Sequence, residues 1–299
     1  MKRLYVIGSS NTDMVVKTQR FPEPGETLLG GDFFMFPGGK GANQAVAAAR
    51  AGGDVHFICA VGDDVFGTNA MHGYIREGMD VSQTLIIPKK ASGVALITVN
   101  GDGENEIVVA SGTNALLGAD HVEQALRDHQ EPAMVLTQLE TPMDTVAHLA
   151  GLCRSKAWPL IINPAPAQLL NREILEHLFL ITPNETEAQL LTGITVNDEK
   201  SAAEAARVFM EKGVHHVIIT MGSKGSFFKS AEDSFFVPAQ KVQAVDTTAA
   251  GDVFNGVLAV CLAEGLPWKD GMVRATKAAA LSVTKMGAQD TAPYKQEFT

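Results

Sequence analysis

Short apolar runs alternate along most of the chain with segments in which apolar residues recur at helical spacing. The runs predict strands, and the periodic segments predict helices. The expected strands are residues 4–8, 55–61, 134–138, 160–163, 179–182 and 217–221. The expected helices include residues 68–77, 145–155, 185–192 and 201–212. This alternation predicts an α/β fold, a three-layer α/β/α sandwich whose helices cover both faces of a mostly parallel central sheet.

Two stretches break this alternation and read as short strands joined by glycine-rich turns. These strands are residues 15–17, 27–36, 94–100 and 106–110. They predict a small second β-sheet inserted approximately at residues 14–36 and 92–111. Because no internal repeat or low-complexity linker interrupts the sequence, we expect one domain spanning residues 1–299.

The segment that follows residue 245 reads as the start of a helix built to hold an anion. Val242 and Val245 lie just before it in an extended, strand-like run. From Ala250 onward we expect one apolar helical face, formed by Val253, Phe254, Val257, Leu258 and Cys261. The first turn of a helix presents unpaired N–H groups and the positive end of the macrodipole, so it attracts phosphate.

A glycine and a carboxylate mark this helix start. Gly251 has no side chain, so a ligand can approach its backbone closely. Asp252 places a carboxylate at the same helix end, where it can take a proton from a hydroxyl that attacks the phosphate. An acidic residue in a first turn is also favoured electrostatically without any chemistry, so this segment alone leaves both interpretations open.

A second glycine-rich segment, Pro37-Gly38-Gly39-Lys40-Gly41-Ala42-Asn43-Gln44, runs into a helix of small residues. Paired glycines let polar ligand atoms touch the backbone, and Lys40 and Asn43 can hydrogen-bond hydroxyl groups. A plain turn explains such a string equally well. The spacing is not that of a Walker A loop, and no Gly-x-Gly-x-x-Gly fingerprint follows the first expected strand.

Four polar or glycine positions come just after expected strands: Asp13, Glu140, Asn184 and Gly222. Ligands on parallel sheets bind beyond the carboxyl ends of the strands. We therefore expect one edge of the sheet to gather these residues.

Composition narrows the class of protein. The chain has 299 residues, of which 45% are apolar, enough for a large core. A net charge of −10 argues against nucleic acid or an anionic membrane as a partner. No run approaches the roughly 18 apolar residues of a membrane span, and the apolar run after Arg3 is too short for a signal peptide. Cys59, Cys153 and Cys261 stand singly in apolar stretches, which indicates reduced thiols and a cytoplasmic protein.

Together, the two glycine-rich segments resemble the paired signatures of the ribokinase (PfkB) family of carbohydrate kinases. Further matches follow in family order, at residues 8–13, 140, 163–167, 182–187 and 220–225. The resemblance covers nearly the whole chain. It implies a ribokinase-like fold whose small sheet covers the sugar as a lid. It also implies ATP-dependent phosphorylation of the 5-hydroxyl of D-ribose, giving D-ribose 5-phosphate and ADP.

The resemblance assigns roles around the sugar. The residues implied to bind it are Asn11, Asp13, Gly39, Lys40, Asn43, Glu140 and Asp252. Asp13 would accept hydrogen bonds from two adjacent hydroxyls, although it also suits a turn. Asp252 is implied as the general base for the primary hydroxyl. The amides implied to stabilise charge on the transferred group are those of Ala249, Ala250 and Gly251.

The resemblance also implies a nucleotide site. The residues implied to bind ATP are Asn184, Glu187, Thr220, Gly222, Ser223, Gly225, Gly251 and Thr276. Asn184 and Glu187 match a motif that organises Mg²⁺ and the triphosphate, largely through water, and they equally suit a helix start. Thr276 departs from the His or Asn that relatives often place beside the adenine.

A monovalent cation site is a further implication of the resemblance. The residues that match the two arms of a K⁺-binding loop are Asp246, Thr248, Ser282, Lys285, Gly287 and Thr291, mostly through backbone carbonyls. Such a cation would fix the loop that carries the anion site without touching the substrate. Oxygen ligands suit a hard cation of this kind.

The apolar residues of one expected lid strand predict that two chains associate. Phe33, Phe34, Met35 and Phe36 leave little of one lid strand polar. One lid face would close over the sugar and the other needs a partner, so we expect a homodimer through the lids, as the resemblance also implies. The alternative is that these side chains pack inward against the main domain.

Several activities share these signatures. The spacing of Asn11 and Asp13 favours ribose, because deoxyribose lacks the 2-hydroxyl that a carboxylate there would hold. Deoxyribokinase and other sugar or nucleoside kinase activities are alternatives. A non-catalytic sugar sensor on the same fold is another, which the presence of Asp252 disfavours.

Overall fold

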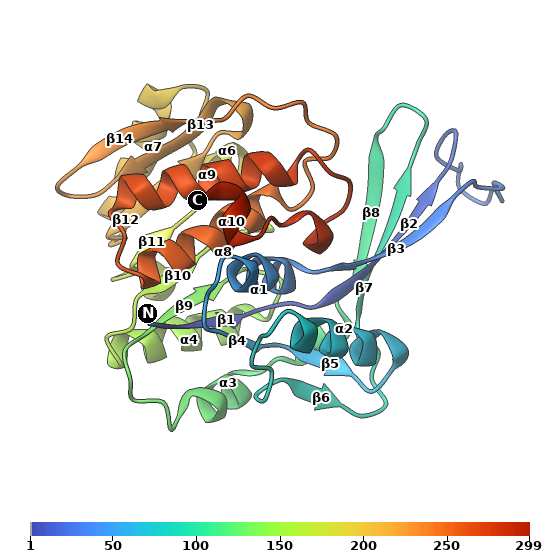
Figure 1. Ribbon diagram of the computed structural model, residues 1–299, viewed down its shortest axis with the longest axis horizontal. Coiled ribbons are helices and arrows are strands. Elements are labelled where there is room, and N and C mark those ends of the chain that lie inside the picture. Colours follow the sequence, from blue (N-terminus) through green and yellow to red (C-terminus); the bar gives the residue numbers. More distant parts are fainter. Residues whose placement is uncertain (1) are drawn as a thin grey trace.

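The computed structural model describes residues 2–299, and its largest element is an eight-stranded sheet (Figure 1). Its strands are β1 (Arg3–Ile7), β4 (Val55–Ile58), β9 (Ala133–Thr137), β10 (Leu160–Ile162), β11 (Leu180–Ile181), β12 (His216–Thr220), β13 (Gly225–Lys229) and β14 (Ser234–Pro238). They lie in the order β14-β13-β12-β11-β10-β9-β1-β4. Pairing is parallel from β4 to β12 and antiparallel at β13 and β14. The mostly parallel sheet predicted from the sequence is confirmed.

Helices cover both faces of this sheet. One face carries α1 (Lys40–Arg50), α2 (Val65–Arg76), α8 (Ala250–Ala263), α9 (Trp268–Ser282) and α10 (Lys295–Phe298). The other carries α3 (Ala119–Leu126), α4 (Met143–Ser155), α5 (Arg172–Leu175), α6 (Glu185–Thr192) and α7 (Glu199–Glu211). Leu4 and Val6 of β1 pack into the first core, and Tyr5 and Ile7 pack into the second, as alternation along a strand requires. The predicted three-layer sandwich is confirmed.

A four-stranded sheet projects from this body (Figure 1). Its strands are β2 (Asn11–Lys17), β3 (Phe33–Gly38), β7 (Gly93–Val99) and β8 (Asn105–Ala110), in the order β3-β2-β7-β8. They fall within or beside the segments expected for a lid. Residues 8–10 join the carboxyl end of β1 to β2, so this sheet begins at the edge where ligands of parallel sheets bind.

One expected strand is wrong in its extent. Residues 55–61 divide at Cys59 between β4 and β5 (Ala60–Gly62), and β5 pairs with β6 (Leu85–Ile87) in a separate two-stranded sheet. Leu85 N donates to Cys59 O over 2.8 Å, which directs the chain toward its new partner. An apolar run indicates that a strand is buried, but it does not indicate which neighbouring strand it pairs with.

Two further expectations of extended structure are also wrong. Residues 27–32 form a loop, and β3 begins only at Phe33. Val242 and Val245 lie in a loop before α8, with 41% and 61% of their surfaces exposed. Within residues 2–299, no helix combines the length and apolar character needed to cross a bilayer.

Candidate active site

The amino terminus of α8 has the form that suits an anion. The helix begins at Ala250, as the periodicity predicts, and its expected apolar face is buried. Ala249 precedes it in the left-handed region, with φ 59°, and no side chain among residues 2–299 caps this end. A Cβ added at Gly251 would meet nothing within 4 Å. No side chain therefore caps the first turn, which is open in front of Gly251, although Ala250 N donates to Thr247 O over 3.3 Å.

Asp252 is buried just inside this helix end, with 6% of its surface exposed. Two amides of α1 donate to its carboxylate: Asn43 Nδ2 lies 3.0 Å from Oδ2, and Gln44 Nε2 lies 2.9 Å from Oδ1. Burial raises the pKa of Asp252 above its ordinary value, and the charge of Lys40 and the two amides oppose that rise. The two glycine-rich segments, far apart in sequence, therefore form one site.

Glycine at positions 38 and 39 lets this segment pass against the start of β2. Gly39 has φ 88°, and a Cβ there would lie 2.7 Å from the backbone nitrogen of Asn11. A Cβ at Gly38 would collide with the carboxylate of Asp13. These positions require glycine because the neighbouring backbone and carboxylate leave no space for a side chain.

Carboxylates gather around Lys40 at the opening of the site. Burial, with the charges of Glu140 and Asp252, raises the pKa of Asp13 to about 6 against the opposing charge of Lys40. Asp252 is the largest of the charges that raise the pKa of Lys40. Glu140 Oε2 accepts from Ser9 Oγ at 2.6 Å and from the Lys40 backbone nitrogen at 3.0 Å. Glu140 follows β9 as expected, whereas the expectation for Asp13 is corrected, because Asp13 lies within β2 of the four-stranded sheet rather than just after a strand of the main sheet.

A cavity of about 470 Å³ lies between the four-stranded sheet and the residues that follow β9. Asn11 and Glu140 line it, together with Val109 of β8 and Thr141. Asn43 Oδ1 is buried and has no hydrogen-bond partner within residues 2–299, so it remains free to accept from a ligand. A cavity of this size with a few convergent polar groups suits a small polyhydroxyl ligand.

The expected nucleotide residues lie around α6 and the turn after β12. Asn184 caps α6 and forms a capping box with Glu187, whose two carboxylate oxygens accept from Asn184 N and Nδ2 at 2.9 Å each. An isolated bridge joins Asn184 to Thr220. The turn that follows contains Gly222, Ser223 and Gly225, and both glycines have positive φ.

Thr276 lies in α9, where its hydroxyl is buried without a hydrogen-bond partner within residues 2–299. A buried hydroxyl of this kind is costly unless something bonds to it. The position therefore fits a polar contact with a ligand.

The two segments expected to hold a cation lie together. Asp246 accepts from Thr248 N at 2.9 Å through Oδ1 and from Gly287 N at 3.1 Å through Oδ2. Burial raises the pKa of Asp246, but these donors outweigh it and keep the pKa below its ordinary value. The hydroxyls of Ser282 and Thr291 bond to nearby backbone oxygens, and the amine of Lys285 lies 3.8 Å from Glu297. The anionic carboxylate of Asp246, which joins the two segments, is an oxygen ligand of the kind that suits a hard cation.

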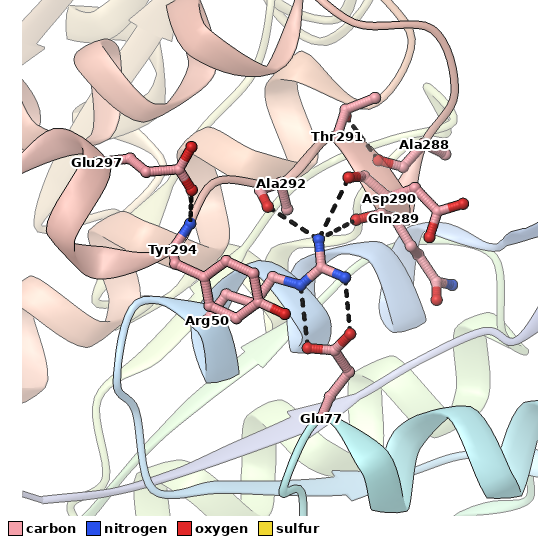
Figure 2. Close-up of polar contacts among 9 residues, drawn as sticks. All are labelled: Arg50, Glu77, Ala288, Gln289, Asp290, Thr291, Ala292, Tyr294 and Glu297. Atoms are coloured by element: carbon pink, nitrogen blue, oxygen red, sulfur yellow. Dashed lines mark hydrogen bonds and ion pairs between the residues drawn. The ribbon is translucent and has the colours of Figure 1, made fainter.

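Arg50, at the end of α1, holds the second of these segments in place (Figure 2). Its Nη1 donates to three backbone oxygens, those of Gln289, Asp290 and Ala292. Its Nε and Nη2 form a bidentate ion pair with Glu77 at 3.0 and 2.7 Å, and its guanidinium lies 5.0 Å from the Tyr294 ring centre. Gln289 Nε2 in turn donates to Gly38 O at 3.2 Å. The segment around Gln289 is therefore bonded to Gly38 in the glycine-rich region and to Arg50 at the end of α1.

Replacing Arg50 with methionine is expected to lower the free energy of unfolding by about 3 kcal/mol, because it leaves the half-buried Glu77 unpaired and removes the donor to the backbone oxygens. Denaturant unfolding measures this loss. Arg207→Met is the matched control, since its ion pair with Glu211 is exposed and contributes less than about 1 kcal/mol. Equal losses in the two variants would contradict the account.

Sequence reasoning missed several polar residues that hold the site. Gln44 bonds Asp252, Ser9 bonds Glu140, and Asn114 Nδ2 donates to Asn11 Oδ1 at 2.7 Å. Gln138 donates to Gln44 Oε1 at 2.7 Å. The available signal was a polar residue in an otherwise small and apolar segment, which is clearest for Gln44 before residues 45–49.

The chain is similar to known proteins over nearly its whole length. Residues 1–295 match the family described as pfkB family carbohydrate kinase. The chain is 43% identical over 296 residues to ribokinase of Haemophilus influenzae, covering 99% of this chain and 97% of that protein. It is 35% identical over 294 residues to deoxyribokinase of Salmonella typhi, covering 98% and 96%. The structure of Arabidopsis thaliana ribokinase complexed with ribose and ATP matches with a TM-score of 0.91 at 28% identity, covering 99% of this chain and 97% of that chain.

Similarity over the full length, on a fold with an open helix end beside a buried carboxylate, defines a sugar kinase. The chain belongs to the pfkB family of carbohydrate kinases. The resemblance inferred from its two glycine-rich segments is confirmed.

Proposed function

We propose that the protein transfers the γ-phosphoryl group of ATP to the 5-hydroxyl of D-ribose, giving D-ribose 5-phosphate and ADP. The observation that carries this proposal is Asp252, a buried carboxylate at an uncapped helix end that two amides hold in an accepting state. The Haemophilus influenzae ribokinase and the Arabidopsis thaliana ribokinase complexed with ribose and ATP support the same pair of substrates.

In this mechanism Asp252 accepts the proton of the 5-hydroxyl as the sugar oxygen attacks the γ-phosphorus. The bond from that phosphorus to the bridging oxygen breaks, and ADP leaves with the electron pair. The amides of Ala249, Ala250 and Gly251 donate to the oxygens of the transferred group, where charge is spread in the transition state. Burial raises the pKa of Asp252, which makes it a better proton acceptor than an exposed aspartate.

We propose that the sugar lies between the start of β2 and the segment that begins α1. Asp13 accepts from two adjacent ring hydroxyls, with Asn11 beside it. Four further groups contact the sugar, from Gly39, Lys40, Asn43 and Glu140. The buried, unpartnered Asn43 Oδ1 supports this placement within residues 2–299.

Substrate choice is tested by ADP release with Mg·ATP and K⁺, comparing D-ribose, 2-deoxy-D-ribose, D-fructose and adenosine at equal concentration. We expect the highest kcat/KM with D-ribose, because loss of the 2-hydroxyl leaves Asp13 without one of its donors. The Salmonella typhi relative makes deoxyribokinase activity the second candidate, and a preference for 2-deoxy-D-ribose would establish it. ATP binding without turnover of any of the four would favour a sugar sensor.

We propose that ATP lies along the turn after β12 with its adenine near Thr276. Thr220, Gly222, Ser223 and Gly225 would follow its phosphates and ribose. Asn184 and Glu187 offer oxygen ligands for Mg²⁺, largely through water, and Mg²⁺ when bound neutralises phosphate charge. K⁺ would bind the segments of Asp246 and Thr248 and of Ser282, Lys285, Gly287 and Thr291, and would stiffen the loop that leads to Ala249.

The KM for D-ribose is expected to rise as the pH falls through about 6. Asp13, whose pKa burial raises to about 6, is ionised above that pH and protonated below it, and the protonated group accepts fewer hydrogen bonds from the sugar. Steady-state kinetics from pH 5 to 8 measure this effect, with Asp13→Asn as the control that lacks the titration. A KM that stays flat over this range in the unmodified protein would rule out Asp13 as the sugar ligand.

We propose a homodimer formed through the outer faces of the lids. The strand register places Met14, Met35, Leu96 and Val108 in one row across the sheet, so they share a face. Met35, Leu96 and Val108 have 55%, 52% and 67% of their surfaces exposed, which is unfavourable for a monomer. Sedimentation is expected to give about twice the chain mass of 31.8 kDa, and Leu96→Lys is expected to give one chain mass. A single chain mass for the unmodified protein would contradict this proposal.

We also propose a cytoplasmic location. Cys59, Cys153 and Cys261 are free and buried, which suits a reducing compartment. Fractionation of cells that produce the protein tests this directly, and recovery from an extracellular fraction would oppose it.

A further inference from the structure

Gln44 contacts the proposed catalytic base from a fully buried position. It belongs to α1, has no exposed surface, and places Nε2 at 2.9 Å from Asp252 Oδ1. Asn43, the residue before it, bonds the other carboxylate oxygen, and its own Oδ1 has no partner within residues 2–299. Gln44 has no exposed surface, so its side chain bonds the base without lying on a surface that a ligand could contact.

The partners of Gln44 fix the orientation of its amide. The second N–H of Nε2 donates to Asn163 Oδ1 at 3.0 Å, and Oε1 accepts from Gln138 Nε2 at 2.7 Å. Asn163 Nδ2 donates a hydrogen bond to Thr182 O at 3.2 Å. These hydrogen bonds run in one direction, from Gln138 to Gln44 and from Gln44 to Asn163. Gln44 can therefore present only an N–H donor to Asp252.

Close packing of two helices holds this contact in register. Gly256 lies one turn after Asp252 in α8, and a Cβ there would collide with the backbone oxygen of Gln44. The backbones of α1 and α8 therefore touch at this crossing. The position of Gln44 relative to Asp252 is set by rigid helices rather than by a loop.

We propose that Gln44 is a positioning residue that keeps Asp252 ionised and aimed at the sugar hydroxyl. Its N–H stabilises the carboxylate and cannot stabilise the protonated acid equally, so it favours the form that accepts a proton. The other charged groups that act on Asp252 are Lys40 of α1, Glu140 after β9, Asp13 of β2 and Glu187 of α6. Of these, only Lys40 favours ionisation, so the amides of Asn43 and Gln44 supply the remaining support.

The test is the pH dependence of kcat at saturating D-ribose and ATP. In Gln44→Met, which keeps the length of the side chain but removes the donor, we expect the acid limb to move up by about one to two pH units. We also expect kcat at pH 7 to fall about tenfold while the KM for D-ribose changes less than about threefold. An acid limb at the position found in the unmodified protein would overturn the proposal.

Two further variants separate positioning from packing. Gln138→Met removes the donor to Gln44 Oε1 but leaves Gln44 Nε2 bonded to Asp252, so its acid limb is expected to move less than that of Gln44→Met. Gln44→Glu fills the original volume, but its carboxyl shares a proton with Asp252, so its limb is expected to rise beyond that of Gln44→Met. Equal limbs in Gln138→Met and Gln44→Met, or an unmoved limb in Gln44→Glu, would show that Gln44 acts only through packing.

This inference rests on the proposed role of Asp252, and the two can fail separately. An unmodified protein that does not turn over D-ribose would remove the proposed function. If the protein is active but Gln44→Met has the same acid limb in its kcat profile as the unmodified protein, only the positioning role is removed.

Discussion

Asp252→Asn is expected to fold normally and to lose at least about 100-fold in kcat, since general-base assistance contributes about 10²–10⁴ in rate. Asparagine matches the shape of the aspartate but cannot accept the proton of the sugar hydroxyl. It also meets the donors of Asn43 and Gln44 with one amide nitrogen in place of a carboxylate oxygen. ADP release at saturating substrates measures the loss, and thermal unfolding shows that the fold survives.

Asp144→Asn is the matched control for this variant. Asp144 also lies in the first turn of a helix, α4, but it is exposed, and α4 covers the face of the sheet opposite to α1 and α8. Its kcat is expected to remain unchanged. Near-normal turnover in Asp252→Asn would remove Asp252 from the mechanism and return it to the electrostatic role of a first-turn acid.

Gly39→Ala is expected to lower kcat/KM for D-ribose by about 100-fold, a loss typical of a displacement of about 1 Å in a reacting site. Position 39 has φ 88°, where alanine is strained by about 1–3 kcal/mol. Its Cβ would also lie 2.7 Å from the backbone nitrogen of Asn11, so the start of β2 must move. That movement carries Asp13 away from Lys40 and Asn43. Steady-state kinetics, with unfolding measured alongside, separate the loss of activity from the loss of stability.

Gly73→Ala is the control for Gly39→Ala. Gly73 lies inside α2 with nothing within 4 Å of an added Cβ, and its φ is not positive. Alanine is expected to stabilise that helix by up to about 1 kcal/mol and to leave kcat/KM unchanged. Equal behaviour of the two variants would show that the close approach at Gly39 has no effect on the site.

Periodicity predicted the layers of this fold because parallel strands covered on both faces are short and almost wholly apolar. Strand β9, buried at all its positions, is the clearest case. The start of α8 at Ala250 was predicted for the same reason, since its buried face begins there. The split of residues 55–61 and the loop at Val242 and Val245 were not predicted, because apolar character does not specify a strand's partner.

The site was predictable where chemistry leaves a sequence signature. The glycines at 38 and 39 stand out because a side chain at either position would collide with its neighbours, and Asp252 stands out as an acid directly after a glycine at a helix start. Gln44 and Arg50 were not predicted. Their roles depend on partners such as Asp252 and Glu77, which only the folded chain brings near them. A glutamine or arginine in a helix is common, so its type alone carries no functional signal.

The most direct test of the central claim is the identity of the product formed from D-ribose and Mg·ATP. Phosphorus and carbon NMR of the reaction mixture would locate the new ester. We expect phosphate on the 5-oxygen of ribose, with one ADP formed for each ester, and at least about 100-fold less ester with Asp252→Asn over the same time. An ester on another oxygen, or ADP formed without a sugar ester, would contradict the proposed geometry of Asp252 and the sugar.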